Sequence, residues 1–529
     1  MTDLPYASEA ARRRTFAIIS HPDAGKTTLT EHVLQAAGAI HLAGQVRARG
    51  ENRRTSSDWM RIERERGISV SSSVMTFEYR DLVFNLLDTP GHEDFSEDTY
   101  RTLTAADSAV MVLDAAKGIE PQTLKLFEVC RLRDIPILTF INKMDREALD
   151  PLELLDEISD KLALDVSPMQ WPAGSGNRFR GVQDLRDNLF LPFEKKTGAE
   201  ASRRINLDDP QMDGFLPDDQ REELSEAAEL AFEAYPTFNR QSYLEGHLTP
   251  VYFGSALRHF GVIELLNALA EHAPGPRPTK AQINGQDAVT QPGDGQTCGF
   301  VFKVQANMDP NHRDRVAFTR LASGKFKRGM KLKTTAGKVM SINSPIMFFA
   351  QDRGIAEEAW AGDVIGIPNH GTLRVGDSLS ETGKVQFAGI PNFAPELLRR
   401  ARPKDPMKAK HLRKALESLA EEGVTQLFKP LIGADMILGA VGQLQIEVTA
   451  ERIAEEYKLD VLFEMSPYAV ARWVRADNQA DLESFMDKHK MQMAEDVDGD
   501  PVFLGKTAWD VGYAQEKFPK VEFMNTKER

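Results

Sequence analysis

The first half of the chain alternates short apolar runs with amphipathic helical stretches, and this alternation limits the fold more than any other feature. Polar or glycine-containing turns follow the apolar runs. Strands that alternate with helices predict a parallel, doubly wound α/β sheet, because each parallel connection needs a crossover. Ligands bind such sheets beyond the carboxyl ends of the strands. The expected strands cover residues 15–20, 82–87, 109–113, 135–141 and 251–254, and the expected helices start near residue 27 and cover 121–132 and 262–271.

Later changes of pattern divide the rest of the chain. Acidic helical stretches at 151–164 and 217–234 interrupt the sheet pattern and indicate an insertion, and the proline-rich run 274–278 predicts a stiff linker. From residue 297 to 379 a period of two between glycine turns predicts a small antiparallel β-barrel. The helices and strands expected over 407–464 fit an α+β module of the split-βαβ, ferredoxin-like type. We therefore expect an α/β domain at 1–278 with an insertion at about 150–247, a β-barrel domain at 279–386 and an α+β domain at 387–529.

The first motif that carries chemistry lies between an expected strand and an expected helix. A phosphate-binding loop needs inward backbone N–H groups, a lysine for the β- and γ-phosphates and a hydroxyl for Mg²⁺. Gly25, Lys26 and Thr27 supply these groups, whereas Ser20 stands where the usual pattern has its first glycine. A chance Gly-Lys-Thr at a helix start is the alternative. The candidate nucleotide-binding residues here are Ser20, His21, Pro22, Asp23, Ala24, Gly25, Lys26 and Thr27.

A second motif, Asp88-Thr89-Pro90-Gly91-His92, follows another expected strand. The Asp88 carboxylate at that strand end can hold Mg²⁺ through water, as the second acidic element of phosphate-loop enzymes does. Gly91 can bring its backbone N–H close to a γ-phosphate, because it has no Cβ. The same residues also form a good turn sequence, and that interpretation would be favoured if no phosphate loop preceded them.

A third motif, Asn142-Lys143-Met144-Asp145, follows the strand expected at 135–141. The Asp145 carboxylate can accept both N–H donors on the Watson–Crick edge of guanine, whereas adenine would leave it unpaired and desolvated, at a high cost. Asn142 would brace the loop and reach the edge of the base, and the Lys143 stem would cover the face of the base. At the next strand end, Ser255 and Ala256 can offer backbone N–H groups to guanine O6. The alternative is a surface turn.

The order of the four motifs predicts a P-loop GTPase that binds GTP or GDP with Mg²⁺. Each motif alone has an ordinary explanation, but together they follow one another at successive strand ends. The segment 65–70, between the first two motifs, lies where a nucleotide-sensing segment belongs. Ser69 there is a candidate magnesium ligand together with Thr27 and Asp88, although a plain polar loop is the alternative.

Composition and charge narrow the setting. The hydrophobic and charged fractions, 41% and 27%, are ordinary for a soluble globular protein. Neither a secretory signal nor a long apolar run occurs, so we expect no membrane partner, and two distant cysteines fit a reducing cytoplasm. A net charge of −14 argues against a protein that coats nucleic acid, and we expect no DNA partner. Two local basic runs, at 45–67 and 399–414, are either solvated faces or RNA contacts.

The motifs at 66–69, 88–92 and 142–145 resemble those of the translational GTPases, the family of elongation factors Tu and G. In that family the histidine positions the attacking water, so the resemblance implies a catalytic role for His92. It also implies that two apolar residues hold the histidine back until the ribosome engages. Pro22 and Ile68 match those positions.

Within that family, longer stretches resemble the bacterial class-II peptide-chain release factors, the release factor 3 group. These stretches are residues 20–27, 92–104, 131–134 and 439–445. The resemblance implies a cytoplasmic GTP hydrolase, expected to be a monomer, that binds ribosomal RNA and proteins. After peptide release it would promote the dissociation of class-I release factors, acting on them indirectly through the ribosome.

Three other functions remain as alternatives. A translational GTPase of elongation or rescue would share every nucleotide-contacting residue. A GTP-gated scaffold without catalysis would have no need of His92. A phosphate-loop ATPase or kinase is disfavoured by Asp145, because adenine has no matching pair of donors.

Overall fold

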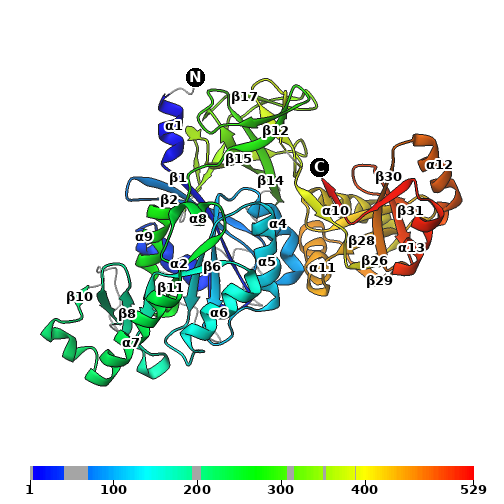
Figure 1. Cartoon of the computed structure of the whole chain (residues 1–529). Helices are drawn as coiled ribbons and strands as arrows, with labels where there is room; N and C mark the ends of the chain where they lie inside the picture. Colours follow the sequence, from blue (N-terminus) through cyan, green and yellow to red (C-terminus); the bar gives the residue numbers. More distant parts are fainter. Residues whose placement is uncertain are drawn as a thin grey trace.

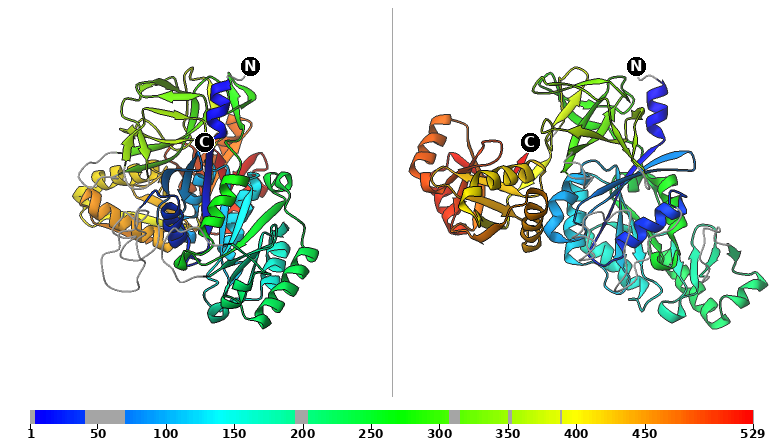
Figure 2. Two further views of the ribbon diagram at one scale, coloured as in Figure 1. Left: turned by 90° about the vertical axis from the view of Figure 1, so that its left-hand side faces the viewer. Right: turned by 180° about the vertical axis from the view of Figure 1, so that it is seen from behind.

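The computed structural model describes residues 4–40, 70–193, 204–306, 315–349, 353–387 and 389–528. The elements form three parts, which Figure 1 shows in sequence colours. An α/β part comes first, a β-rich part packs against one end of it, and a C-terminal α+β part lies beside helices α4 (Ser96–Leu103) and α5 (Pro121–Leu132). The view from behind in Figure 2 shows the same arrangement.

A seven-stranded sheet forms the core of the α/β part, in the order β2-β3-β1-β4-β5-β11-β6. Neighbouring strands are parallel, except for the antiparallel β2–β3 pair. Successive side chains of β1 enter different cores, because Ile18 belongs to one buried cluster and Ile19 to another. The expected doubly wound sheet is therefore confirmed. Its strands are β1 (Arg13–Ser20), β2 (Ser73–Tyr79), β3 (Leu82–Asp88), β4 (Ser108–Asp114), β5 (Ile137–Asn142), β6 (Asp165–Pro168) and β11 (Leu248–Phe253).

Helices cover both faces of this sheet. Leu29 of α2 and Leu265 of α9 pack in one core, whereas Leu126 of α5 and Leu155 of α6 pack in the other. Among the described residues, no helix is long and apolar enough to span a membrane. The remaining helices of this part are α1 (Leu4–Ala11), α2 (Lys26–Ala36), α6 (Pro151–Leu162), α7 (Asp218–Ala234), α8 (Arg240–Leu244) and α9 (Val262–His272).

A small antiparallel sheet lies between α6 and α7, in a region for which the sequence indicated only helices and irregular chain. Its strand order is β10-β9-β8-β7. Trp171 and Phe190 of this sheet are buried in a cluster shared with Leu155, so the small sheet and the large one have a continuous core. The strands are β7 (Gln170–Pro172), β8 (Gly181–Asp184), β9 (Leu189–Pro192) and β10 (Ile205–Asn206).

The β-rich part is antiparallel, as its period of two predicted. Its larger sheet has the order β18-β17-β23-β14-β15-β22-β19-β20, beside sheets β13-β12-β24 and β16-β21. Buried Arg320 joins this part to the α/β part, donating to the Asp107 carboxylate and to Thr15 Oγ1. The strands are β12 (Thr279–Ile283), β13 (Gln286–Thr290), β14 (Cys298–Ala306), β15 (Arg315–Ser323), β16 (Lys325–Lys327), β17 (Lys331–Thr334), β18 (Val339–Ser341), β19 (Ile346–Phe348), β20 (Arg353–Ile355), β21 (Glu358–Trp360), β22 (Val364–Asn369), β23 (Ser378–Ser380) and β24 (Val385–Phe387).

The C-terminal part contains two βαββαβ modules, although the sequence indicated one. The first runs β26-α10-β27-β28-α11-β29 and the second runs β30-α12-β31-β32-α13-β33. The two modules join through strands β27 and β31 into an antiparallel sheet of order β29-β26-β28-β27-β31-β32-β30-β33. The ferredoxin-like expectation is thus confirmed, with a second copy of the same topology. The elements are β26 (Leu397–Pro403), α10 (Ala409–Glu421), β27 (Gln426–Pro430), β28 (Met436–Ala440), α11 (Gln443–Tyr457), β29 (Val461–Met465), β30 (Val470–Ala476), α12 (Gln479–Lys488), β31 (Met493–Glu495), β32 (Pro501–Gly505), α13 (Ala508–Lys517) and β33 (Val521–Met524).

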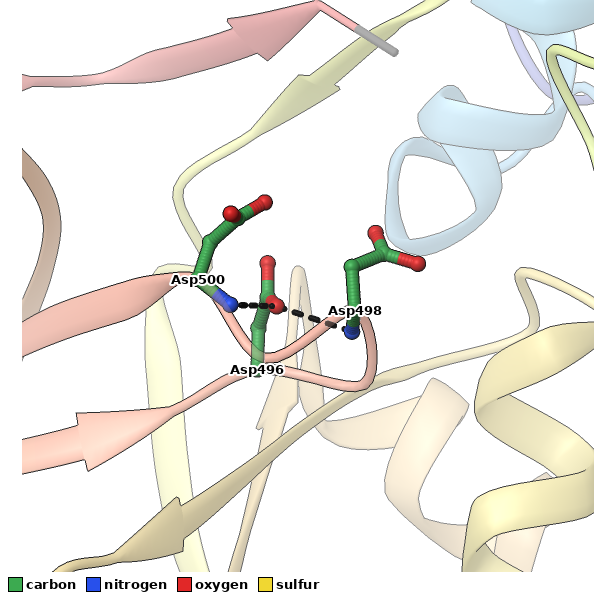
Figure 3. A group of neighbouring side chains, drawn as sticks. All are labelled: Asp496, Asp498 and Asp500. Carbon is green, nitrogen blue, oxygen red and sulfur yellow. Dashed lines mark hydrogen bonds between the residues drawn. The ribbon is translucent and has the colours of Figure 1, made fainter. Parts of the chain in front are cut away.

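The two ends of the C-terminal part are tied together. Strand β25 (Pro391–Phe393) pairs antiparallel with β34 (Thr526–Glu528). Next to this pair, Asp496, Asp498 and Asp500 gather in one turn, shown in Figure 3, where Asp496 Oδ1 accepts the backbone N–H groups of the other two. The Lys527 ammonium lies against all three carboxylates, 2.7 Å from Asp496 Oδ2 and 2.9 Å from Asp498 Oδ2. This lysine supplies the positive charge that the cluster needs.

Candidate functional site

The structure brings the four sequence motifs to one edge of the seven-stranded sheet. Each motif begins at or just after the last residue of its strand, namely β1, β3, β5 or β11. Because these strands run parallel, their carboxyl ends meet at the same edge. Helix α2 starts at this edge with Gly25 as its N-cap residue, so its free N–H groups point toward the site. An anion is the ligand that such an N-terminus favours.

Glycine is required at position 25 for two reasons. Its φ of 97° lies in the left-handed region, which strains residues that carry a Cβ. A Cβ would also overlap the side-chain nitrogen of Asn142. Gly91 of the second motif lies against the same loop, since a Cβ there would be 3.7 Å from Pro22 Cα. The first two motifs are therefore in direct contact.

Lys26 and Asp88 form a buried ion pair at the centre of the site. Lys26 Nζ is 2.6 Å from Asp88 Oδ1, with side chains only 6% and 2% exposed. Thr30 Oγ1 lies 3.3 Å from the same carboxylate oxygen. Thr27, one residue along α2 from Lys26, is half-buried. A lysine, a carboxylate and a hydroxyl thus stand together, which is the donor set that nucleotide phosphates and Mg²⁺ require.

Asn142 joins the phosphate loop to the third and fourth motifs. Its Nδ2 donates to Ala24 O at 2.9 Å, and its Oδ1 accepts from Ala256 N at 2.8 Å and Lys143 N at 2.9 Å. The side chain is 2% exposed. One amide therefore fixes the spacing between the loop that would hold phosphates and the loop that would hold a base.

The third motif is held by a carboxylate that the sequence analysis did not single out. Lys143 Nζ lies 2.7 Å from Asp114 Oδ2 at the end of β4, and it also donates to Asp23 O at 2.5 Å. Asp114 is the last residue of β4, as Asp88 is of β3, so a polar residue at a strand exit was the available signal. Asp145 accepts from Ser255 Oγ at 2.5 Å through Oδ1. Its Oδ2 lies 3.7 Å from Arg258 Nε.

His92 lies half-exposed at the start of the turn Glu93–Phe95. Its Nδ1 accepts the backbone N–H of Asp94 at 3.2 Å, and its ring meets Phe95 edge-on with the centroids 6.2 Å apart. Pro22, one of the two apolar positions beside the histidine in the resemblance, lies next to Gly91. The other, Ile68, lies outside the described residues, as do Ser69 and the basic run 45–67.

Two histidines lie beside the loop that contains Ser255 and Ala256. The rings of His32 on α2 and His259 after Ala256 have centroids 3.7 Å apart. Burial, and then the neighbouring His259, lower the pKa of His32 to about 4. Burial also lowers the pKa of His259. Both rings therefore stay neutral at neutral pH.

Comparison with known proteins gives three family matches in consecutive parts of the chain. Residues 11–275 match the elongation factor Tu GTP binding domain, and residues 296–382 match elongation factor G domain 2. Residues 387–515 match the class II release factor RF3, C-terminal domain. A crystal structure of a protein from Thermus thermophilus is also similar, at 26% identity and a TM-score of 0.68. The match covers 88% of this chain and 71% of that one.

Proposed function

The chain belongs to the elongation factor Tu GTP-binding-domain family, as a translational GTPase of the release factor 3 type, and on this premise we propose that it uses GTP hydrolysis on the ribosome to promote dissociation of class-I release factors. The main support is the Asn142 side chain, which joins the phosphate loop to the guanine-side loop. A site of this kind would hold both ends of one nucleotide.

Guanine selection rests on Asp145 in this proposal. Ser255 Oγ donates to one carboxylate oxygen and so restrains the orientation of the group. A carboxylate accepts two parallel N–H bonds from guanine, whereas adenine would leave it unpaired in a desolvated site. Lys143, fixed by Asp114, would lay its stem along the base.

The phosphates would bind the N-terminus of α2 and Lys26. Residues 20 to 27 supply backbone N–H groups and the Lys26 ammonium, which favour an anion. The hydroxyl of Thr27 and the Asp88 carboxylate are oxygen ligands of the kind that Mg²⁺ prefers, and Ser69 is a proposed third. When bound, Mg²⁺ neutralises charge on the phosphate oxygens.

His92 is the proposed catalytic residue. It follows Gly91 directly, and Gly91 lies against the phosphate loop, which supports a place for the imidazole near a bound γ-phosphate. Its role would be to orient the attacking water through a ring nitrogen. Its side chain is 33% exposed, so a ribosomal element can reach it.

The exposed cations near the start of α10 are the proposed contact with ribosomal RNA. Within the basic run 399–414, Arg400 and Arg402 pair with Asp435 at 3.7 and 2.8 Å, so both already have an intramolecular partner. Lys408 precedes the helix, Lys410 lies in its first turn and Lys414 in its second, and all three are exposed. Lysines presented in this way bind phosphates with a strong salt dependence. Lys410→Glu should weaken ribosome binding and reduce its salt slope, whereas Lys280→Glu on the β-rich part should change neither.

The decisive experiment measures GTP turnover and factor release together. Ribosomes stalled at a stop codon carry a labelled class-I release factor, and the protein is added with GTP. We expect ribosomes to stimulate turnover and the label to leave faster. His92→Ala should abolish the stimulation, whereas His370→Ala, at an exposed turn of the β-rich part, should not. If turnover is stimulated but the label leaves no faster, the chain serves elongation or rescue instead.

A further inference from the structure

Helix α11 in the C-terminal part is capped by a side chain from the α/β part. Its own N-cap residue is Gly442, which has no side chain to offer. The Asp94 carboxylate takes this place, because Oδ2 accepts the backbone N–H of Leu444 at 2.6 Å. A carboxylate at a helix N-terminus satisfies a free donor and interacts favourably with the helix dipole.

The contact around this cap is close and apolar. Phe95, directly after Asp94, is buried in a cluster with Val70, Val448 and the partly buried Leu444. A Cβ on Gly442 would overlap the Asp94 carboxylate. Glycine at position 442 therefore lets the two parts approach, and any larger residue there would displace the carboxylate.

The same carboxylate lies beside the proposed catalytic histidine. Asp94 Oδ1 is 3.5 Å from His92 Nδ1, which already accepts the Asp94 backbone N–H. A backbone N–H can only donate, so Nδ1 must present its lone pair, and the proton of the neutral ring is on Nε2. In this arrangement Nε2 donates a hydrogen bond and cannot accept one from water.

We propose that Asp94 is a positioning residue for which α11 and His92 compete. While α11 holds the carboxylate, His92 keeps its proton on Nε2. When α11 withdraws, the bond from the Asp94 backbone N–H to Nδ1 breaks and the carboxylate accepts an Nδ1–H from His92 instead. Nε2 then becomes an acceptor that can orient the attacking water. The ring releases the Nε2 proton to water and takes one from water at Nδ1, so its charge is unchanged. The effect on hydrolysis rests on the proposed role of His92.

Other contacts would make this withdrawal cooperative. Helix α4 follows the His92 turn directly and bonds the C-terminal part at two further points. Arg101 donates to Gly423 O and, at 3.1 Å, to Asn392 Oδ1, while Glu97 Oε1 accepts from Gln426 Nε2 at 2.8 Å. A movement of the C-terminal part breaks these bonds together with the Asp94 cap. The Asp94 carboxylate is therefore released toward His92 in a single cooperative step.

Two variants of Gly442 test the competition without altering the nucleotide site. Gly442→Ala displaces the carboxylate by its Cβ. Gly442→Ser does the same and also caps α11 with its own hydroxyl, so the helix keeps an acceptor and the fold is protected. The control is Gly512→Ala on α13, where a Cβ would meet nothing within 4 Å. Thermal unfolding confirms that each variant is folded.

The readouts are the His92 tautomer and the turnover without ribosomes. Nitrogen-15 NMR at pH 8, with His92→Ala to assign the signal, should show Nε2–H in the wild type and the Gly512 control and Nδ1–H in both Gly442 variants. Ribosome-independent turnover should rise on the order of tenfold in the Gly442 variants. If both variants keep Nε2–H, the inference about Asp94 is overturned, whether or not His92 is catalytic. If His92→Ala keeps full ribosome-stimulated turnover, the catalytic assignment fails and the competition for Asp94 is judged from the tautomer.

Discussion

Replacing Asn142 with alanine tests whether one buried amide holds the two halves of the nucleotide site together. The substitution removes three hydrogen bonds, to Ala24 O, Ala256 N and Lys143 N. A net hydrogen bond contributes about 1 kcal/mol, and a buried group left without a partner costs about 1 to 3 kcal/mol. Because bound nucleotide needs both loops in their present places in this proposal, three lost bonds correspond to a loss of about 3 kcal/mol in the free energy of nucleotide binding.

A loss of about 3 kcal/mol corresponds to roughly a hundredfold weaker binding. The assay is calorimetric titration of Asn142→Ala with GDP and with a non-hydrolysable GTP analogue. Both affinities should fall by a similar factor, because Asn142 joins the loops and does not itself touch a γ-phosphate in this proposal. Urea unfolding without nucleotide would separate a general loss of stability from a loss confined to the site.

The matched control is Asn206→Ala. Asn206 is exposed and accepts one backbone hydrogen bond, from Asp208 N at 3.0 Å, outside the nucleotide site. We expect nucleotide affinity within twofold of the wild type for this control. An Asn142→Ala protein that binds both nucleotides within threefold of the wild type would refute the reasoning, because the amide would then not determine the spacing of the loops.

Three further substitutions probe the base, the contact between parts and the pH response. Asp145→Asn should prefer xanthosine to guanosine nucleotides, and an unchanged preference in competition binding would contradict our assignment of the base contact. Arg320→Ala leaves Asp107 buried without this partner and should lower the free energy of unfolding in urea by about 3 to 5 kcal/mol, whereas exposed Arg328→Ala should change it by under about 1 kcal/mol. Burial lowers the pKa of His32 from 6.5 in the unfolded chain to about 4, so the unfolded chain binds more protons between these values and stability falls as pH drops through that window. His32→Gln should remove this component, and urea curves with parallel pH dependence for the two proteins would argue against it.

Much of the α/β part was predictable because its signals are local. A buried strand reads as an apolar run of a few residues, and helices such as α5 show their pattern within about three turns. The loop around Gly25 has a specific composition, since the left-handed backbone at this helix N-terminus selects for glycine, and the binding of phosphates there selects for lysine at the next position. The fold class and the translational GTPase family were therefore predicted from the sequence and are confirmed.

Long-range partners were not predictable in the same way. Lys143 meets Asp114 across 29 positions, and Leu444 meets Asp94 across 350. No periodicity or composition near either residue indicates its partner, because the pairing depends on how strands and parts come together. The second βαββαβ module was missed for a related reason: β31 has only three residues, too few for a strand pattern.

The pairing of β25 with β34 has a consequence for the growing chain. Residues 391–393 open the C-terminal part, yet their strand partner is at residues 526–528. During synthesis from the N-terminus, the α/β part is complete more than a hundred residues before this pair can form. The nascent chain therefore passes through a stage in which the nucleotide site can form, whereas the C-terminal part that packs beside helix α4 is still incomplete. A translational GTPase of this type thus has, during its own synthesis, a stage in which its nucleotide site can form before the final docking of its C-terminal part.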